Sequence, residues 1–191
     1  MILVFATNNE HKLAEVQALI GDKFQLRTLK DINCLDDIPE TGNTFEENAI
    51  QKTEYIYKAH HINCFADDSG LEVEALNGAP GVYSARYSGS RDSETNLQLV
   101  LEKLKGSENR KANFRSVISL MLDGKQHLFE GAVHGTIRNE KAGDDGFGYD
   151  PIFQPDGYDI TFAEMNAEEK NRISHRGIAI RKMVEYLKTL A

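Results

Sequence analysis

The sequence predicts a mixed α/β protein in which strands alternate with helices and one pair of strands forms an antiparallel hairpin. Residues 2–6 form an apolar run, and a polar turn and a helical pattern follow it. Residues 114–122 and 127–137 have the composition of strands and flank the turn pair Asp123-Gly124. The C-terminal segment has apolar residues at helical spacing, namely Ile180, Met183, Val184, Leu187 and Leu190.

The first half of the chain predicts two helices and three strands in order. The first strand leads to a helix whose apolar face is Leu13, Val16, Leu19 and Ile20. A second strand is expected over residues 24–29. Thr44 and Glu47 have capping-box spacing and predict a helix to about residue 60. A short strand, residues 64–66, is expected to end at Asp67.

The second half adds the hairpin and two further helix signals. Asp92 or Ser93 is expected to cap a helix that runs to Lys105 and stops at Gly106. Thr161 and Glu164 repeat the capping-box spacing ahead of the last helical region.

Composition limits the classes of function. A chain of 191 residues with 40% hydrophobic residues suits one large domain or two closely joined lobes with a real core. Its formal net charge of −8 argues against binding an extended nucleic acid, because an acidic surface repels a phosphate polymer. A small phosphorylated substrate remains compatible with that charge.

Cysteine content and hydropathy indicate a protein of the cytoplasm. Cys34 and Cys64 are the only cysteines and lack metal-ligand spacing, which favours a reducing compartment. The apolar run at residues 2–6 is too short to span a membrane and lacks a basic leader. We therefore expect a cytoplasmic protein without membrane association.

Residues 7–12 are the first candidate for substrate binding. Thr7, Asn9 and Lys12 place a hydroxyl, an amide and an ammonium group at the start of a helix. Such groups can hold phosphate oxygens by charge and hydrogen bonds. An ordinary capped helix with a solvated lysine explains the same residues equally well.

The sequence DDSG at residues 67–70 is the second candidate. Burying two adjacent carboxylates without partners is costly, and a bound Mg²⁺ would relieve that cost through carboxylate ligands. Glu40 lies in an upstream loop from which it could reach the same metal, whereas Glu47 suits a capping role. An Asp-rich turn without a metal is the alternative.

Two segments near the C-terminus are candidates for binding the rest of a ligand. Residues 143–151 set Phe147 and Tyr149 among glycines, which allow a backbone to approach a flat ring that stacks on an aromatic side chain. A turn with packed aromatic residues explains this segment as well. Residues 168–177 gather cationic side chains in an acidic protein and suggest an anion or carbonyl site. A solvated helix end explains Arg172 well, but it explains His175 and Arg176 less well.

Together, these segments resemble the inosine/xanthosine triphosphate pyrophosphatase family. The matching pieces, in order, are Thr7-x-Asn9-x-x-Lys12, Glu40-Thr41-Gly42 with Glu47-Asn48-Ala49, Ala66-Asp67-Asp68-Ser69-Gly70-Leu71, Gly78-Ala79-Pro80-Gly81 with Tyr83-Ser84-Ala85-Arg86, Phe147-Gly148-Tyr149-Asp150-Pro151, and Ser174-His175-Arg176-Gly177. The resemblance implies a long central mixed β-sheet flanked by helices, with two lobes enclosing an active-site cleft. It also implies a single domain over residues 1–191, a homodimer and a requirement for Mg²⁺.

The same resemblance implies roles for individual residues. The phosphates would be held by Thr7, Asn9, Lys12 and Lys52. Glu40 and Asp68 would coordinate the metal or its waters with Asp67 in support, and Asp68 would also accept a proton from water. Substrate or base contacts would come from Asn8, Glu10, His11, Ser69, Phe147, Gly148, Tyr149, Asp150, Lys170, His175 and Arg176. Asn8 stands where many relatives have glycine.

The implied reaction is hydrolysis of aberrant purine nucleoside triphosphates (ITP, dITP, XTP) to a monophosphate and pyrophosphate. This reaction would keep deaminated purines out of DNA and RNA. A pyrophosphatase for modified pyrimidine triphosphates is one alternative, against which residues 147–150 and 174–176 argue. A non-catalytic sensor of purine nucleotides is another, although it would not need Glu40, Asp67 and Asp68.

Overall fold

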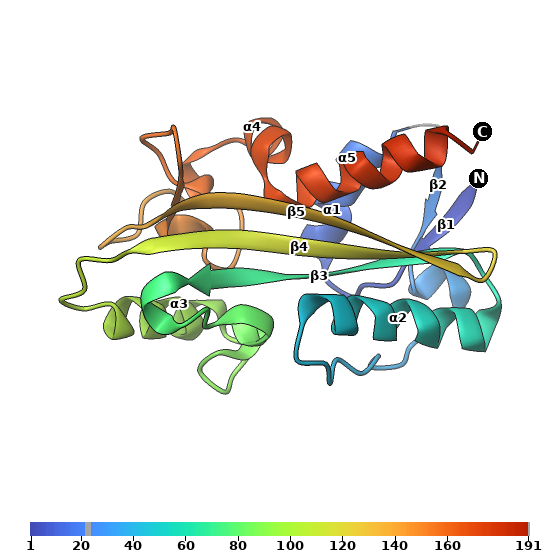
Figure 1. Cartoon of the computed structure of the whole chain (residues 1–191), viewed down its shortest axis with the longest axis horizontal. Coiled ribbons are helices and arrows are strands. Elements are labelled where there is room, and N and C mark those ends of the chain that lie inside the picture. Colours follow the sequence, from blue (N-terminus) through green and yellow to red (C-terminus); the bar gives the residue numbers. More distant parts are fainter. Residues whose placement is uncertain (22–23, 191) are drawn as a thin grey trace. The chain divides into compact units, whose positions relative to one another are not determined.

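The computed structural model describes residues 1–21 and 24–190 and confirms a mixed α/β fold (Figure 1). Six strands form one sheet in the order β2-β1-β3-β4-β5-β6. The sheet is mixed because β1 is parallel to β2 and β3, whereas β5 is antiparallel to β6. The strands are β1 (Ile2–Phe5), β2 (Gln25–Arg27), β3 (Cys64–Val73), β4 (Lys111–Leu122), β5 (Lys125–Ile137) and β6 (Phe153–Pro155).

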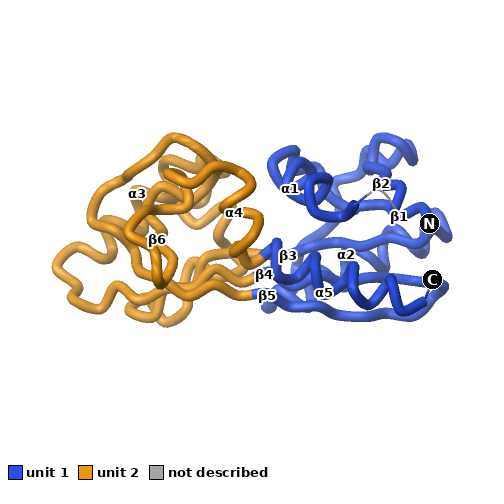
Figure 2. The backbone as a smooth tube through the Cα atoms, turned by 90° about the horizontal axis from the view of Figure 1, so that it is seen from above, with its two compact units in different colours: residues 1–68, 116–131, 176–191 blue, residues 69–115, 132–175 orange. Residues whose placement is uncertain are grey.

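Five α-helices flank these strands, and the chain divides into two compact units (Figure 2). The helices are α1 (Glu10–Ile20), α2 (Phe45–His60), α3 (Ser93–Lys103), α4 (Ala167–Ile173) and α5 (His175–Lys188). Unit 1 comprises residues 1–68, 116–131 and 176–191, and unit 2 comprises residues 69–115 and 132–175. Strands β3, β4 and β5 each contribute residues to both units.

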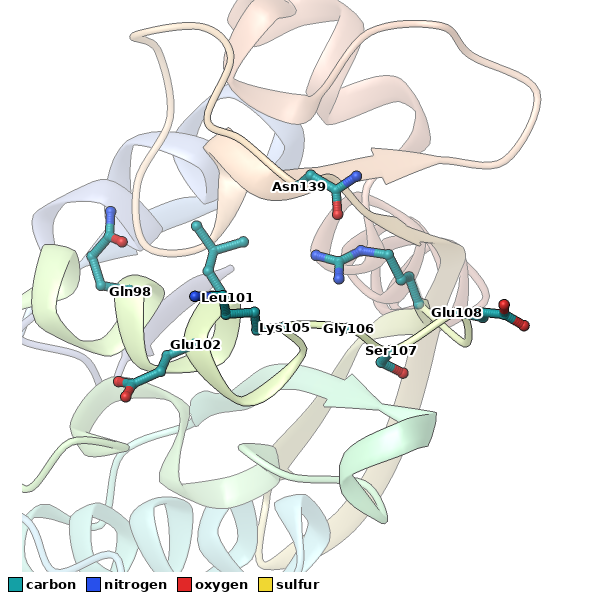
Figure 3. A pocket seen from close by; sticks show the side chains of 9 residues that line it. Gln98, Leu101, Glu102, Lys105, Gly106, Ser107, Glu108 and Asn139 are labelled. Atoms are coloured by element: carbon teal, nitrogen blue, oxygen red, sulfur yellow. The ribbon is translucent and has the colours of Figure 1, made fainter.

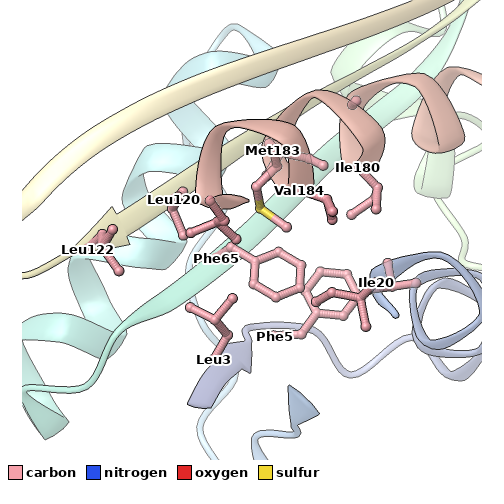
Figure 4. Close-up of a cluster of buried hydrophobic side chains, with 13 residues drawn as sticks. Leu3, Phe5, Ile20, Phe65, Leu120, Leu122, Ile180, Met183 and Val184 are labelled. Carbon is pink, nitrogen blue, oxygen red and sulfur yellow. The ribbon is translucent and has the colours of Figure 1, made fainter. Parts of the chain in front are cut away.

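Unit 1 packs apolar side chains on both faces of its strands. The register of β1 on β3 pairs Phe5 with Phe65, and their rings stack 4.6 Å apart. Ile20 of α1 and Met183 of α5 join this cluster on one face (Figure 4). The intervening β3 residues, Cys64 and Ala66, instead pack with Ile56 of α2 in a separate cluster. Because side chains alternate along a strand, α1 and α5 cover one face of β3 and α2 covers the other.

Unit 2 has its own core, built around Phe114 of β4. The Phe114 ring lies 4.7 Å from that of Phe153 and 5.8 Å from that of Phe162. Helix α3 contributes its apolar face to the same cluster. That helix starts where Asp92 accepts a hydrogen bond of 2.8 Å from the backbone N–H of Thr95, as the sequence predicts.

Several local predictions are confirmed with small shifts in length. Helix α2 ends at residue 60, and β4 and β5 are joined by Asp123 and Gly124, with φ values of 48° and 77°. Two positive φ values are the backbone of a tight two-residue hairpin. Strand β2 is three residues long rather than six, and α3 ends at residue 103. In the described ranges, 1–21 and 24–190, no helix is long and apolar enough to cross a membrane.

The structure corrects the predicted end of β3, which continues through Asp67 to Val73. The pairing recorded between β1 and β3 reaches Phe5 and Phe65, and a further bond joins the N–H of Ala6 to the carbonyl of Phe65. Beyond that point β4, the other neighbour of β3 in the sheet, remains as a partner. The acidic pair therefore lies within a strand, beside the end of β1, and not in a turn.

Of the two capping-box predictions, the one at Thr44 is corrected and the one at Thr161 is confirmed. Thr44 caps α2, but the Glu47 carboxylate accepts its hydrogen bond from the N–H of Asn43 instead of returning to Thr44. Glu164 does accept from the N–H of Thr161, but it opens only a three-residue 3₁₀ helix. The capping box that starts α4 is formed by Asn166 and Glu169.

Candidate active site

Asp67 and Asp68 lie side by side on β3 and face different partners. Asp67 shares the face of Phe65, toward α1 and α5, and Asp68 shares the face of Ala66, toward α2. Both are almost completely buried, with 2% and 7% of their surface exposed. Burial at this level requires that each carboxylate find polar partners.

Asp67 is held between two cations. One carboxylate oxygen lies 3.1 Å from the Lys12 ammonium, and the other accepts a hydrogen bond of 3.0 Å from Nε of Arg176. Arg176 also forms an ion pair with Glu15. Burial by itself would raise the pKa of Asp67, but Lys12 and Arg176 outweigh it and hold that pKa well below its usual range. Asp67 is therefore ionised in the folded protein.

Asp68 has the opposite electrostatic environment. Its carboxylate accepts a hydrogen bond of 2.9 Å from the amide of Asn48. Burial raises the pKa of Asp68 above its usual value, and Lys52 and Lys12 offset only part of that effect. The nearby Glu40 carboxylate raises the pKa of Asp68 further. Two neighbouring carboxyl groups with opposite pKa shifts are typical of sites that divide proton transfer from charge stabilisation.

Lys52 connects the Glu40 loop to β3. Its ammonium forms an ion pair with the Glu40 carboxylate and donates a hydrogen bond of 2.7 Å to the backbone carbonyl of Asp67. Burial would raise the pKa of Glu40, but the Lys52 charge outweighs it and lowers that pKa. Glu40, Lys52 and both aspartates thus form one group of charges inside unit 1. We refer to Lys12, Glu40, Lys52, Asp67, Asp68 and Arg176 as the charged cluster.

The turn before α1 uses its polar side chains for capping. The Asn9 side-chain oxygen accepts hydrogen bonds from the N–H groups of His11 (3.0 Å) and Lys12 (3.2 Å). Thr7 accepts in turn from the N–H of Asn9, at 3.1 Å. The structure therefore places Asn9 as the N-cap of α1, which directs Lys12 toward Asp67. The other three residues of this segment before Lys12, namely Asn8, Glu10 and His11, are exposed.

Unit 2 contains a second buried ion pair, next to aromatic rings. The Lys170 ammonium lies 2.7 Å from the Asp150 carboxylate and 4.7 Å from the centre of the Phe147 ring. The same Asp150 oxygen accepts a hydrogen bond of 2.9 Å from the N–H of Phe147. At Gly146, φ is +76° and a Cβ atom would collide with the Asp150 carboxylate, so only glycine fits. We call Phe147, Asp150, Phe162 and Lys170 the aromatic–lysine cluster.

The remaining predicted residues of unit 2 take up packing positions. The His175 ring stacks on Phe114, with centroids 4.8 Å apart. Tyr149 is buried and its hydroxyl donates a hydrogen bond of 2.7 Å to the carbonyl of Ser84. Gly148 has a φ of 61°, and Ser69 lies half-buried on β3. Tyr149 thus connects the segment of residues 147–150 to Ser84 through the core of unit 2.

Figure 3 shows a surface pocket of unit 2. The guanidinium of Arg110, one of its lining residues, donates hydrogen bonds to the carbonyls of Leu104, Ile137 and Arg138. The other lining residues are Gln98, Leu101, Glu102, Lys105, Gly106, Ser107, Glu108 and Asn139. None of the candidate site residues lines this pocket.

The structure adds two residues that the sequence did not single out for the site. Asn48 contacts Asp68, and Glu15 contacts Arg176. Glu15 lies three residues after Lys12 on one helix, a spacing that places both side chains on the same side. The structure also assigns two residues that are adjacent in the sequence to different units. Arg176 belongs to the charged cluster of unit 1, whereas His175 packs in unit 2. Among the residues that the structure describes, no group of three or more His, Cys, Asp or Glu side chains could hold a metal ion.

This chain is similar in sequence to one protein family over nearly its whole length. The model of the Ham1 family matches residues 3–186. Proteins named dITP/XTP pyrophosphatase from Christiangramia forsetii and Flavobacterium johnsoniae are 52% and 49% identical, and each alignment covers 98% of this chain and at least 98% of the relative. A protein of that name from Bacillus subtilis is 43% identical, over 96% of both chains.

Solved structures agree with the sequence comparison. The Ham1 protein of Staphylococcus aureus is 41% identical with a TM-score of 0.92, and the alignment covers 100% of both chains. A HAM1 protein from Coxiella burnetii is 40% identical with a TM-score of 0.91, over 99% of both chains. With a family model that spans nearly the whole chain and relatives near half identity, this protein is a member of the Ham1 family.

Proposed function

We propose that this enzyme, a nucleoside triphosphate pyrophosphatase, hydrolyses aberrant purine nucleoside triphosphates such as ITP, dITP and XTP to a monophosphate and pyrophosphate. The names of the relatives from Christiangramia forsetii, Flavobacterium johnsoniae and Bacillus subtilis support this choice of substrate. In our proposal this reaction removes deaminated purines from the nucleotide pool. The enzyme would act in the cytoplasm as a homodimer.

The opposite environments of Asp67 and Asp68 carry the proposal. Asp68 has a raised pKa, so its carboxylate is a stronger base than an ordinary aspartate. In our proposal Asp68 orients and deprotonates the water that attacks the α-phosphorus in line with the leaving pyrophosphate. Asp67 is already neutralised by Lys12 and Arg176 and fixes the position of these two cations.

The chemistry of the charged cluster fits a magnesium ion. Mg²⁺ is commonly bound by one or two carboxylates, several waters and the phosphates of a substrate, so three protein ligands are not required. Glu40 and Asp68 would supply the carboxylate oxygens, and they lie close enough for Glu40 to raise the pKa of Asp68. A bound Mg²⁺ would neutralise charge on the triphosphate and polarise the attacking water. Lys12 and Lys52 would hold phosphate oxygens nearby.

The aromatic–lysine cluster supports recognition of the base. Phe147 is half-buried and offers a ring on which a purine can stack. Lys170 is a donor that suits the 6-oxo group of hypoxanthine or xanthine, and adenine would leave its amino group without a partner there. Lys170, His175 and Arg176 are the proposed contacts to the polar edge of the base. In this structure Lys170 pairs with Asp150, and Arg176 pairs with Asp67 and Glu15.

A hydrolysis panel tests this function. Inosine, xanthosine, adenosine, guanosine and modified pyrimidine triphosphates would be compared with and without Mg²⁺, with pyrophosphate and phosphate measured separately. We expect Mg²⁺-dependent release of pyrophosphate, fastest from ITP, dITP and XTP. Equal rates on ATP, or a preference for modified pyrimidines, would contradict the substrate assignment. Light scattering of the purified protein tests the homodimer.

A further inference from the structure

Side chains of α2 hold three consecutive backbone N–H groups of the preceding loop. Gln51 accepts a hydrogen bond from the N–H of Thr41 (2.9 Å), Asn48 from that of Gly42 (2.8 Å), and Glu47 from that of Asn43 (2.6 Å). The segment directly after Glu40 is thereby fastened to the first two turns of the helix.

Asn48 differs from the other two because its amide has a second partner. Its nitrogen donates to the Asp68 carboxylate at 2.9 Å, while its oxygen accepts from the N–H of Gly42. These two hydrogen bonds define which end of the Asn48 amide is oxygen and which is nitrogen, since a backbone N–H requires an acceptor and a carboxylate requires a donor. Asn48 is 1% exposed, so both bonds are shielded from water.

Gly42 supplies the space for this contact. A Cβ atom at Gly42 would lie 2.5 Å from Cβ of Glu47 and 2.9 Å from the side-chain oxygen of Asn48. Any larger residue would therefore push the loop away from α2 and weaken the bond to Asn48. Glycine at this position and asparagine at residue 48 act as a matched pair.

We infer that Asn48 is a positioning residue that sets the orientation of the Asp68 carboxylate and ties it to the loop carrying Glu40. The inference rests on the proposed function, in which Asp68 is the base. One oxygen of Asp68 is held by the amide, which restricts rotation of the carboxylate. Loss of such a supporting contact commonly costs about 10- to 100-fold in activity or metal affinity.

Three variants separate positioning from loop anchoring. Asn48→Ala removes both bonds, and we expect kcat to fall about 10- to 100-fold with KM within about threefold. Gln51→Ala is the matched control, because it loosens the same loop without touching Asp68, and its kcat should stay within about threefold of wild type. Asn48→Asp keeps the acceptor for Gly42 but places a second carboxylate against Asp68, so kcat should fall at least as far as in Asn48→Ala.

Crystal structures of the wild type, Asn48→Ala and Gln51→Ala provide a readout independent of turnover. We expect Asp68 to change rotamer only in Asn48→Ala. An unmoved Asp68 in that variant, or equal losses of kcat in Asn48→Ala and Gln51→Ala, would overturn the inference. Failure of the wild type to hydrolyse ITP would instead refute the proposed function, and the Asp68 rotamer would still decide whether Asn48 positions that carboxylate.

Discussion

The carboxylates of Asp67 and Asp68 lie on opposite faces of β3, although the two residues are adjacent. Asp67 contacts Lys12 of α1 and Arg176 of α5, while Asp68 contacts Asn48 of α2. The alternation of side chains along a strand produces this separation. One carboxylate is thereby committed to ion pairs, and the other stays buried with a raised pKa.

This arrangement predicts contrasting effects on stability. Asp67→Asn leaves Lys12 and Arg176 buried without their shared counter-charge, so the free energy of unfolding should fall by about 3–5 kcal/mol. Asp68→Asn removes a carboxylate whose charge is penalised by burial and keeps an acceptor for Asn48, so stability should be unchanged or slightly higher. Urea denaturation followed by circular dichroism measures both. Equal destabilisation by the two variants would refute the division of roles.

A comparison of nucleotide binding with turnover in Asp68→Asn tests the proposed role of Asp68 as the base. Asp68→Asn should reduce kcat by about 10²- to 10⁴-fold, because an amide cannot accept the proton of the attacking water. Nucleotide binding, measured by calorimetry, should change much less, since Lys12 and Lys52 remain. Turnover near the wild-type rate in Asp68→Asn would rule out Asp68 as the base.

Phe147 provides a test of base stacking. Phe147→Ala should weaken binding of ITP by about 5- to 150-fold, the equivalent of about 1–3 kcal/mol for one stacked base. Phe147→Tyr retains the ring and is the control, with KM expected close to wild type. Because Phe147 is only half-buried, the thermal midpoint should move little in either variant. An unchanged KM in Phe147→Ala would place the base elsewhere.

Cys64 predicts a specific loss of stability at alkaline pH. Burial raises the pKa of its thiol to about 12 from an ordinary value of 9.0. Between those values the unfolded chain releases the proton and the folded chain keeps it, so the free energy of unfolding should fall by about 1.4 kcal/mol per pH unit from this group. Cys64→Ala should be less stable at neutral pH because it leaves a cavity, but its alkaline slope should be shallower. An identical slope would contradict the prediction.

Several features could be predicted from the sequence because neighbouring residues determine them. The caps at Asn9, Thr44 and Asp92 are made by side chains that bond N–H groups two or three residues away. The Asp123-Gly124 turn follows from the tolerance of these residues for positive φ. The ordered set of motifs was likewise sufficient to identify the family.

Other features were decided only by tertiary structure, because their partners are distant along the chain. The strand that carries Asp67 and Asp68 extends to Val73, past the end of its pairing with β1, and its long-range neighbour there in the sheet is β4. Arg176 reaches Asp67 across 109 residues, and Asn48 reaches Asp68 across 20. The sequence by itself determined which chemical groups are present and where the local helices and turns begin. The packing of α1, α2 and α5 on β3 decided which carboxylate is neutralised by cations and which is buried with a raised pKa, because burial and charge act through space.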